Sequence, residues 1–255
     1  MMNTVKIRGV TIGEGAPKIC VPLIGKTLEQ LKEEAALLQS INPDLAEWRA
    51  DFFEDVEDVG KVKKVLADIR EILKDTPLIF TFRSAEEGGE KEVGREFYFA
   101  LNHAVVKTGL ADVIDVELFN EEQDVKKLVE AAHMHHVFVI ISNHDFEKTP
   151  KAEEIVSRLR RAQDLGADLP KIAVMPETPA DVLTLLEATH MMHERYADRP
   201  IITMSMAGKG VISRLAGEVF GSAVTFGAAK KASAPGQIEA ADLKHILDVL
   251  HRNLL

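Results

Sequence analysis

The feature that most constrains the fold is an alternation, repeated along the whole chain, of short apolar runs and longer amphipathic stretches. The apolar runs are rich in Ile, Val, Leu and Phe and are continuous rather than alternating, as in strands of parallel sheets that are buried on both faces. They are predicted as strands at residues 19–24, 45–49, 78–83, 113–118, 137–142, 171–175, 201–206 and 223–226.

The stretches between these runs carry apolar residues three and four positions apart, the spacing of one helix face. Leu28, Leu31, Ala35 and Leu38 form such a stripe. The other predicted helices are 62–73, 94–107, 121–132, 151–165, 179–196, 210–220 and 240–254. About eight strand–helix repeats in a chain of this size are typical of a (β/α)8 TIM barrel. A doubly wound open sheet is the alternative, but no Gly-x-Gly-x-x-Gly motif opens its first helix.

The two ends of this pattern and the lack of a linker define the domain organisation. Residues 5–12 alternate around Gly9, which predicts a short N-terminal β-hairpin that closes the bottom of the barrel. No Pro/Gly/Ser-rich segment separates two regions of different composition. We therefore expect residues 1–255 to form a single (β/α)8 barrel catalytic domain.

Charge and cysteine content exclude several classes of partner. The net charge of −10 argues against binding to nucleic acid or to an anionic membrane. The one cysteine, Cys20, rules out an intrachain disulfide and suits a reducing compartment, and its apolar neighbours place it in the core. No apolar run approaches membrane-spanning length and no signal-peptide pattern opens the chain, so a cytoplasmic protein is expected.

Two residues predict chemistry based on an amine nucleophile. Lys171 lies in the apolar run 171–175, and His144 follows the run 137–142. Burial disfavours the charged form of a lysine, and a neutral amine can attack a carbonyl carbon while an imidazole moves the protons. The less specific interpretations are that Lys171 extends its ammonium into water and that His144 merely starts a loop. Lys171 also opens its run, at the wrong end for catalysis unless the strand begins near Asp168.

Further polar side chains stand where barrel enzymes carry their active sites, at the C-terminal ends of the strands. Arginines suit a carboxylate, Glu and Arg suit hydroxyls, and a lysine suits a ketone, so the set predicts a small polyhydroxylated keto-acid as substrate. The alternative is that Arg49 and Arg83 only pair with Glu47 and Glu87 in ion pairs at the rim. The candidate residues are Glu47, Arg49, Arg83, Glu87, Met204, Met206, Arg214, Ser233 and Gln237.

Two histidine clusters resemble metal sites but lack the right surroundings. His133, His135 and His136 precede the strand 137–142 and so belong to the opposite, structural face. His190 and His193 share a helix face without a further ligand of the required kind. We therefore expect neither a metal nor another cofactor.

Five motifs resemble those of type I 3-dehydroquinate dehydratase, and the likeness extends over essentially the whole chain. They are Glu-Trp-Arg at 47–49, Phe-Thr-Phe-Arg-Ser at 80–84, Ser-Asn-His-Asp-Phe at 142–146, Pro-Lys-Ile-Ala-Val-Met-Pro at 170–176 and Ala-Ser-Ala-Pro-Gly-Gln at 232–237. The resemblance implies a (β/α)8 barrel, commonly a homodimer, that acts in the shikimate pathway of aromatic amino acid biosynthesis. It also implies a cofactor-free reaction, the syn elimination of water from 3-dehydroquinate to give 3-dehydroshikimate.

The same resemblance implies a role for each candidate residue. Lys171 would form an imine with the substrate, His144 would be the general acid/base, and Glu87 would orient and charge His144. Glu47, Arg49 and Arg83 would hold the ring hydroxyls, and Met204 and Met206 would pack against the ring. Arg214, Ser233 and Gln237 would bind the carboxylate, with the loop 230–237 closing over the site.

Two other functions are compatible with the residues alone. A Schiff-base aldolase would share the barrel and the lysine, and Gly208 and Gly210 could belong to the phosphate site that a sugar-phosphate aldolase requires. A barrel without catalytic activity would bind a keto-acid and release no product.

Overall fold

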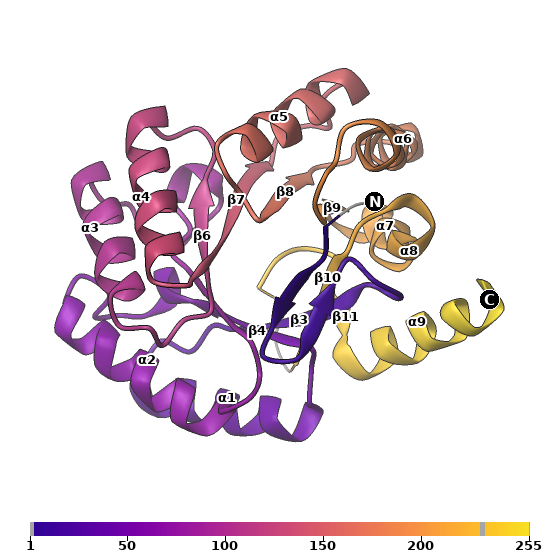
Figure 1. Ribbon diagram of the computed structural model, residues 1–255. Helices are drawn as coiled ribbons and strands as arrows, with labels where there is room; N and C mark the ends of the chain where they lie inside the picture. Colours follow the sequence, from indigo (N-terminus) through magenta and orange to yellow (C-terminus); the bar gives the residue numbers. More distant parts are fainter. Residues whose placement is uncertain (1–2, 230–232, 255) are drawn as a thin grey trace.

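The computed structural model describes residues 3–229 and 233–254 and contains one large parallel sheet surrounded by helices (Figure 1). Eight of its strands are neighbours in chain order and curl into a TIM-like barrel, as predicted. These strands are β3 (Lys18–Leu23), β4 (Leu45–Arg49), β5 (Leu78–Thr81), β6 (Val113–Glu117), β7 (Phe138–Asp145), β8 (Leu169–Val174), β9 (Ile202–Ser205) and β10 (Val224–Ala228). The short strand β11 (Ile238–Glu239) pairs with β10.

Helices follow the strands and cover the outside of the sheet (Figure 1). They are α1 (Leu28–Ile41), α2 (Val59–Leu73), α3 (Arg95–Val106), α4 (Glu122–Met134), α5 (Ala152–Asp164), α6 (Pro179–Arg195), α7 (Val211–Leu215), α8 (Gly217–Phe220) and α9 (Ala240–Leu254). The single helix predicted at 210–220 is two short helices that meet at Ala216. A Cβ at Gly217 would stand 2.6 Å from the carbonyl oxygen of Ser222, so the chain turns tightly there.

A side chain joins the two strands at which the sheet closes. Ile201 and Ser222, just before β9 and β10, form a parallel bridge, and the backbone N–H of Ala223 donates to the carbonyl of Ile201 at 2.8 Å. The backbone N–H of Thr203 donates to Ser222 Oγ at 2.9 Å. A serine hydroxyl thus supplies an acceptor that a backbone carbonyl supplies elsewhere in the barrel.

Two strand boundaries differ from the prediction in a way that matters for the site. Strand β8 begins at Leu169, so Lys171 is its third residue and not its first. Strand β7 continues to Asp145, because its last residues pair in register with β8: His144 with Ala173 and Asp145 with Val174. His144 is therefore held by the sheet itself.

The predicted hairpin is present and lies at the end of the barrel where the strands begin. Strands β1 (Val5–Ile7) and β2 (Val10–Ile12) are antiparallel, and Arg8 and Gly9 between them both have positive φ, at 44° and 88°. Two positive φ values are typical of the tight turns whose twist fits a hairpin. Val5, Ile7 and Ile12 pack against first residues of barrel strands such as Leu45 and Val113, which closes this end with apolar side chains.

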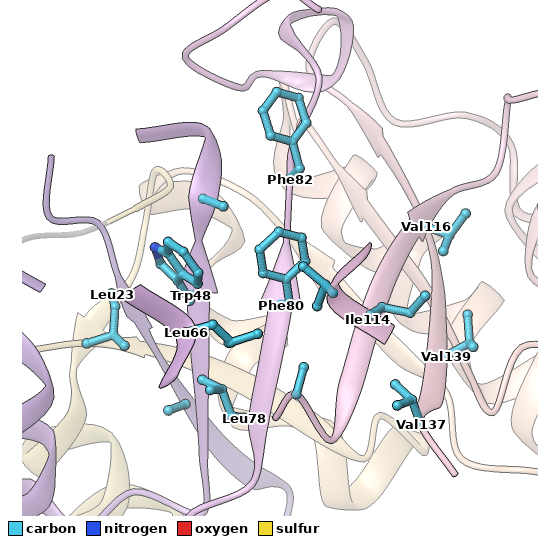
Figure 2. Close-up of a cluster of buried hydrophobic side chains, with 14 of the residues drawn as sticks. Leu23, Trp48, Leu66, Leu78, Phe80, Phe82, Ile114, Val116, Val137 and Val139 are labelled. Carbon is cyan, nitrogen blue, oxygen red and sulfur yellow. The ribbon is translucent and has the colours of Figure 1, made fainter. Parts of the chain in front are cut away.

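The alternation along each strand separates an outer apolar layer from an inner polar one. Figure 2 shows the outer layer, where Trp48 and Phe80 lie on neighbouring strands; their ring centroids are 5.5 Å apart at 78°. In β4, Ala46 and Trp48 belong to this layer between sheet and helices. Because side chains alternate along a strand, Glu47 and Arg49 then point into the barrel. Packing of the outer layer thus fixes the direction of the inner charges.

Cys20 is fully buried in the inner apolar layer near the hairpin, as predicted. In the described part of the chain, none of the helices combines the length and the apolar character needed to cross a membrane.

Candidate active site

A cavity of about 110 Å³ opens at the C-terminal ends of the strands. It is well below the roughly 300–1,000 Å³ of sites for drug-sized ligands, so it suits a small metabolite. The residues that the sequence singled out all line it, together with Gly88, Phe146, Ala173, Phe226, Ala234 and Pro235. Those residues are Glu47, Arg49, Arg83, Glu87, His144, Lys171, Met204, Met206, Arg214, Ser233 and Gln237.

The amine of Lys171 lies inside the barrel and does not extend into water. The residue is 5% exposed, and its Nζ lies 3.5 Å from Asp115 Oδ2 and 3.9 Å from Glu47 Oε1. The ring of Phe226 lies beneath it, with the centroid 4.5 Å from Nζ. The interpretation of Lys171 as a solvated strand end is therefore wrong, and the amine faces a cavity large enough for a carbonyl compound.

Asp115, which the sequence reasoning missed, is the buried partner of this lysine. It is fully buried on β6, where it accepts hydrogen bonds from Arg83 Nη2 at 2.8 Å and from Ser142 Oγ at 2.6 Å. Burial alone would raise the pKa of Asp115, but the charges of Arg83 and Lys171 outweigh it and hold that pKa below its usual value. An ionised carboxylate therefore stands next to the amine.

The arginines on β4 and after β5 are paired, but mostly with other residues than those expected from the sequence. Arg49 forms a two-pronged ion pair with Asp51 at 2.8 Å for both bonds. Arg83 Nη1 donates to Glu117 Oε1 at 2.9 Å and lies 3.7 Å from Glu87 Oε2. Both arginines are buried. Of the two ion pairs in that alternative, Arg83–Glu87 is present, whereas Arg49 pairs with Asp51 and not with Glu47.

The carboxyl group of Glu47 lies at the cavity wall, and no arginine pairs with it in the described part of the chain. Its Oε1 accepts a hydrogen bond from Thr81 Oγ1 at 2.9 Å and lies near Lys171. A carboxylate held in this way can accept a hydrogen bond from a ligand hydroxyl.

His144 and Glu87 form a buried acid–base pair. Glu87 Oε2 lies 2.9 Å from His144 Nδ1 and accepts the backbone N–H of the same residue at 3.0 Å. Burial raises the pKa of Glu87 to about 8, against the opposing effect of Arg83. Burial, with the charges of Arg83, Lys171 and Arg49, lowers the pKa of His144 well below its usual value. The two groups therefore titrate as a coupled pair, and Nε2 of the imidazole, which does not face Glu87, is left for a bound molecule.

A short turn positions Glu87. Ser84 caps the 3-10 turn Ala85–Glu87 by accepting the backbone N–H of Glu87 at 3.3 Å. Gly88 follows with φ of 83°, and a Cβ there would stand 2.4 Å from the ring of Phe146. Glycine therefore lets the chain turn back directly beneath the aromatic ring and brings the carboxylate to His144.

Arg214 on α7 is a buried cation that has no carboxylate partner among the described residues. It is 2% exposed, and its hydrogen bonds go to the carbonyls of Pro235 at 3.1 Å and Phe226 at 3.5 Å. Its Nε has no hydrogen-bond partner in the described part of the chain. Burial lowers the pKa of Arg214 to about 10. A desolvated guanidinium of this kind is ready to pair with an anion.

Residues 233–237, before β11, contribute to the lining of the cavity. Gln237 Oε1 accepts the backbone N–H of Ser233 at 2.9 Å, and Gln237 Nε2 donates to Ser233 Oγ at 3.0 Å. The Ser233 carbonyl lies 3.5 Å from Arg49 Nη1, so the segment also contacts the β4 side of the cavity. Of the loop 230–237, Lys230, Lys231 and Ala232 lie outside the described residues.

The histidine cluster that was set aside lies on the opposite face, as expected. His133 Nε2 lies 2.9 Å from Asp168 Oδ2, before the strands β7 and β8 begin. Within residues 3–229 and 233–254, no group of three or more His, Cys, Asp or Glu side chains is arranged to hold a metal ion.

Comparison with known proteins gives one consistent result. The family model for type I 3-dehydroquinase matches residues 19–254. The 3-dehydroquinate dehydratase of Bacillus licheniformis is 76% identical over 254 residues, 100% of both chains, and that of Listeria monocytogenes is 65% identical over 98% of this chain and 99% of its own. The crystal structure of type I 3-dehydroquinate dehydratase from Clostridium difficile with covalently modified comenic acid superposes with a TM-score of 0.97. That enzyme is 58% identical, and the match covers 99% of this chain and 100% of that one.

Proposed function

The chain belongs to the type I 3-dehydroquinase family, and we propose that it is a hydro-lyase that converts 3-dehydroquinate to 3-dehydroshikimate in the shikimate pathway. The observation that supports this most directly is that the buried amine of Lys171 shares a small cavity with the buried guanidinium of Arg214, which has no counter-charge among the described residues. A keto-acid presents the two groups that such a pair would bind. This function replaces the aldolase and the non-catalytic barrel that the sequence alone left open.

Lys171 is the proposed nucleophile. Its amine attacks the ketone carbon of the substrate and forms a carbinolamine. The ketone oxygen takes one proton from the attacking amine and a second from His144 and leaves as water, which gives a protonated imine. The positive imine withdraws electrons and stabilises the enamine that forms when the neighbouring carbon loses its proton. Asp115, which already lies 3.5 Å from Nζ, is the proposed counter-ion of this imine.

His144 is the proposed general acid/base. Its Nδ1 is directed at Glu87, so Nε2 is the nitrogen that takes the proton from carbon and then gives it to the departing hydroxyl. One imidazole can serve both steps because the eliminated proton and hydroxyl leave from the same face of the ring. Glu87 stabilises the imidazolium between the two transfers.

The remaining residues are proposed to hold the substrate. Arg214 pairs with the carboxylate and so fixes the ring relative to Lys171, assisted by Ser233 and Gln237. The polar groups of Glu47, Arg49 and Arg83 bind the ring hydroxyls. Met204, Met206 and Phe226 supply the apolar walls.

Borohydride trapping tests this assignment. Reduction in the presence of 3-dehydroquinate should add the mass of the reduced ligand to the peptide that contains Lys171, and Lys171→Ala should lose both the adduct and nearly all turnover. The matched control is Lys209→Ala, which removes an exposed lysine that donates to the carbonyl of Glu177 on the same face. Product formed without an adduct, or substantial turnover by Lys171→Ala, would contradict the imine mechanism.

We further propose that residues 1–255 form one catalytic domain, that the enzyme assembles as a homodimer and that it works in the cytoplasm. The family resemblance supports the dimer, and the buried free thiol of Cys20 fits a reducing compartment. Since the proposed steps use only side chains, activity should survive treatment with a chelator. Sedimentation velocity gives the oligomeric state directly.

A further inference from the structure

A second residue besides His144 holds the carboxylate of Glu87. Asn143 precedes His144 on β7, and its Nδ2 donates to Glu87 Oε1 at 3.4 Å. Because side chains alternate along a strand, Asn143 lies on the outer side of the barrel while His144 lines the cavity. The catalytic carboxylate is therefore held from both faces of the same strand.

Arg158 on the outer helix α5 fixes the other end of this amide. Its Nη1 donates to Asn143 Oδ1 at 2.9 Å. The guanidinium is itself held by Glu154 Oε1 at 2.9 Å from Nε and by Asp145 Oδ2 at 3.4 Å from Nη1. It also stacks on the ring of Phe119, with 5.3 Å between Cζ and the centroid. The guanidinium of Arg158 is thus held in place by contacts from α5, β7 and the segment after β6.

The chemistry of a side-chain amide makes this contact directional. An amide has a donor end and an acceptor end, and a guanidinium can only donate. Arg158 therefore selects the orientation in which the oxygen of Asn143 faces outward and its NH2 group faces Glu87. The flipped amide would place an oxygen against the carboxylate and an NH2 group against the guanidinium, so both contacts would be lost at once.

We propose that Arg158 is a positioning residue that sets the Asn143 amide and, through Glu87, the catalytic orientation of His144. It does so from the outer helix layer, without lining the cavity. This role rests on the proposed function of His144 and Glu87 as the acid–base pair. The exposed ring of Phe119, 57% accessible, then has a function as the surface on which the guanidinium is stacked.

The charges around the pair set the direction of the expected pH effect. Glu87 faces Arg83 from the end of β5 and the carboxylates of Asp115 and Glu117 from β6. His144 faces Arg83, Lys171 and Arg49. The hydrogen bond that Asn143 donates also acts on Glu87: it favours the ionised form and so lowers the pKa of that carboxyl group. Loss of that bond should raise the pKa of Glu87 further, so the acid limb of the kcat profile should move to higher pH.

The experiment compares Arg158→Met with Arg160→Met across the pH range. Arg160 lies on the same helix and stacks on Tyr196 at 4.6 Å, so its replacement removes a comparable cation at a site unconnected to Glu87. For Arg158→Met we expect a loss of about tenfold in kcat, a KM within about twofold of the wild type and an acid limb shifted upward by about half a pH unit. Arg160→Met should keep the wild-type profile.

Arg158→Lys is a second variant for the case in which Arg158→Met fails to fold, because lysine keeps the aliphatic stem and the positive charge. Its compact ammonium lacks the planar fork of the guanidinium, so it should hold the amide less firmly and give the same changes at about half the size. Wild-type kinetics in the Arg158 variants, even with a lower melting temperature, would show that Arg158 only ties α5 to β7 and would overturn the proposal. An equal loss in Arg160→Met would overturn it as well.

His144→Ala separates this role from the proposed function. If His144→Ala is inactive while Arg158→Met matches the wild type, only the role of Arg158 is refuted. Near-normal turnover by His144→Ala would refute both, because Arg158 would then have no acid–base group to position.

Discussion

The carboxylate of Asp115 should be worth about two orders of magnitude in turnover. Its Oδ2 lies 3.5 Å from Lys171 Nζ, the atom proposed to become the positive nitrogen of the imine. At an effective dielectric constant of about 20, two unit charges at this distance attract by about 5 kcal/mol. Glu47, 3.9 Å from the same nitrogen, keeps part of that attraction when Asp115 is replaced. We therefore expect Asp115→Asn to lose about 3 kcal/mol of imine stabilisation, roughly 150-fold in kcat.

The same replacement should also weaken the fold, so a control for stability is needed. Asp115 accepts an ion-pair hydrogen bond from Arg83, and removal of one partner of a buried pair costs about 3–5 kcal/mol. Asp112 offers the matched control at the other end of β6. It pairs with Arg8 at 2.7 Å and with Arg70 at 2.6 Å, far from the cavity. Asp112→Asn should lower the unfolding free energy and leave kcat unchanged.

Three assays together test this reasoning. Denaturant titration gives the unfolding free energy of both variants, steady-state kinetics gives kcat, and borohydride trapping gives the rate at which the imine accumulates. We expect Asp115→Asn to trap more slowly than the wild type and Asp112→Asn to trap at the wild-type rate. If Asp115→Asn turned over within about threefold of the wild type, the carboxylate would not be the counter-ion of the imine.

Two further predictions concern other charges in the site. Arg214→Met should raise KM by roughly a hundredfold, since it removes the proposed charge-assisted bond to the substrate carboxylate. Melting should show no loss of stability, because a buried cation without a carboxylate partner among the described residues is also removed; an unchanged KM would assign the carboxylate to another residue. Burial raises the pKa of Glu87 to about 8 from an ordinary 4.5, so its stabilising contribution is complete below pH 4.5 and is lost as the pH rises through 8. Between pH 6.5 and 8 the wild type should therefore lose more unfolding free energy than Glu87→Gln, by at most about 1.4 kcal/mol per pH unit; parallel stability curves would argue against a buried, proton-binding carboxyl.

The barrel could be predicted from sequence because its signal is local and repeated. Each strand is a continuous apolar run and each helix has an apolar stripe, so the order of elements follows without any long-range contact. The start of β8 was harder to predict, because Pro170 argues against a central strand. In the structure, pairing of β8 with β9 begins only at Lys171 and Ile202, so Pro170 lies where β9 requires no N–H from it.

A site residue could be predicted only where the neighbouring sequence distinguished it from ordinary core or surface residues. Lys171 and His144 belong to recognisable motifs in or just after apolar runs, and Arg214 follows the run 201–206. Asp115 and Glu117, by contrast, lie within β6, a strand that looks apolar because Val113, Ile114 and Val116 dominate it. Two carboxylates at a spacing of two in a buried strand could have revealed them, since buried charges need partners. Asn143 and Arg158 had no such signal, because their meeting depends on how α5 packs against β7.

Among the described residues, the guanidinium of Arg214 has carbonyl partners but no carboxylate partner, and this affects how the enzyme selects among metabolites. The empty protein carries the desolvation penalty of a buried cation, and only an anionic ligand relieves it. A neutral analogue with the same ring and the same ketone would leave the guanidinium with only the neutral carbonyls of Pro235 and Phe226 as acceptors, and its Nε without a partner among the described residues. Such a site discriminates mainly by binding the neutral analogue weakly, and less by extra contacts to the anionic substrate. Selectivity for the acid is thus built into the ligand-free protein, because the desolvation penalty of Arg214 is offset only when an anionic substrate binds.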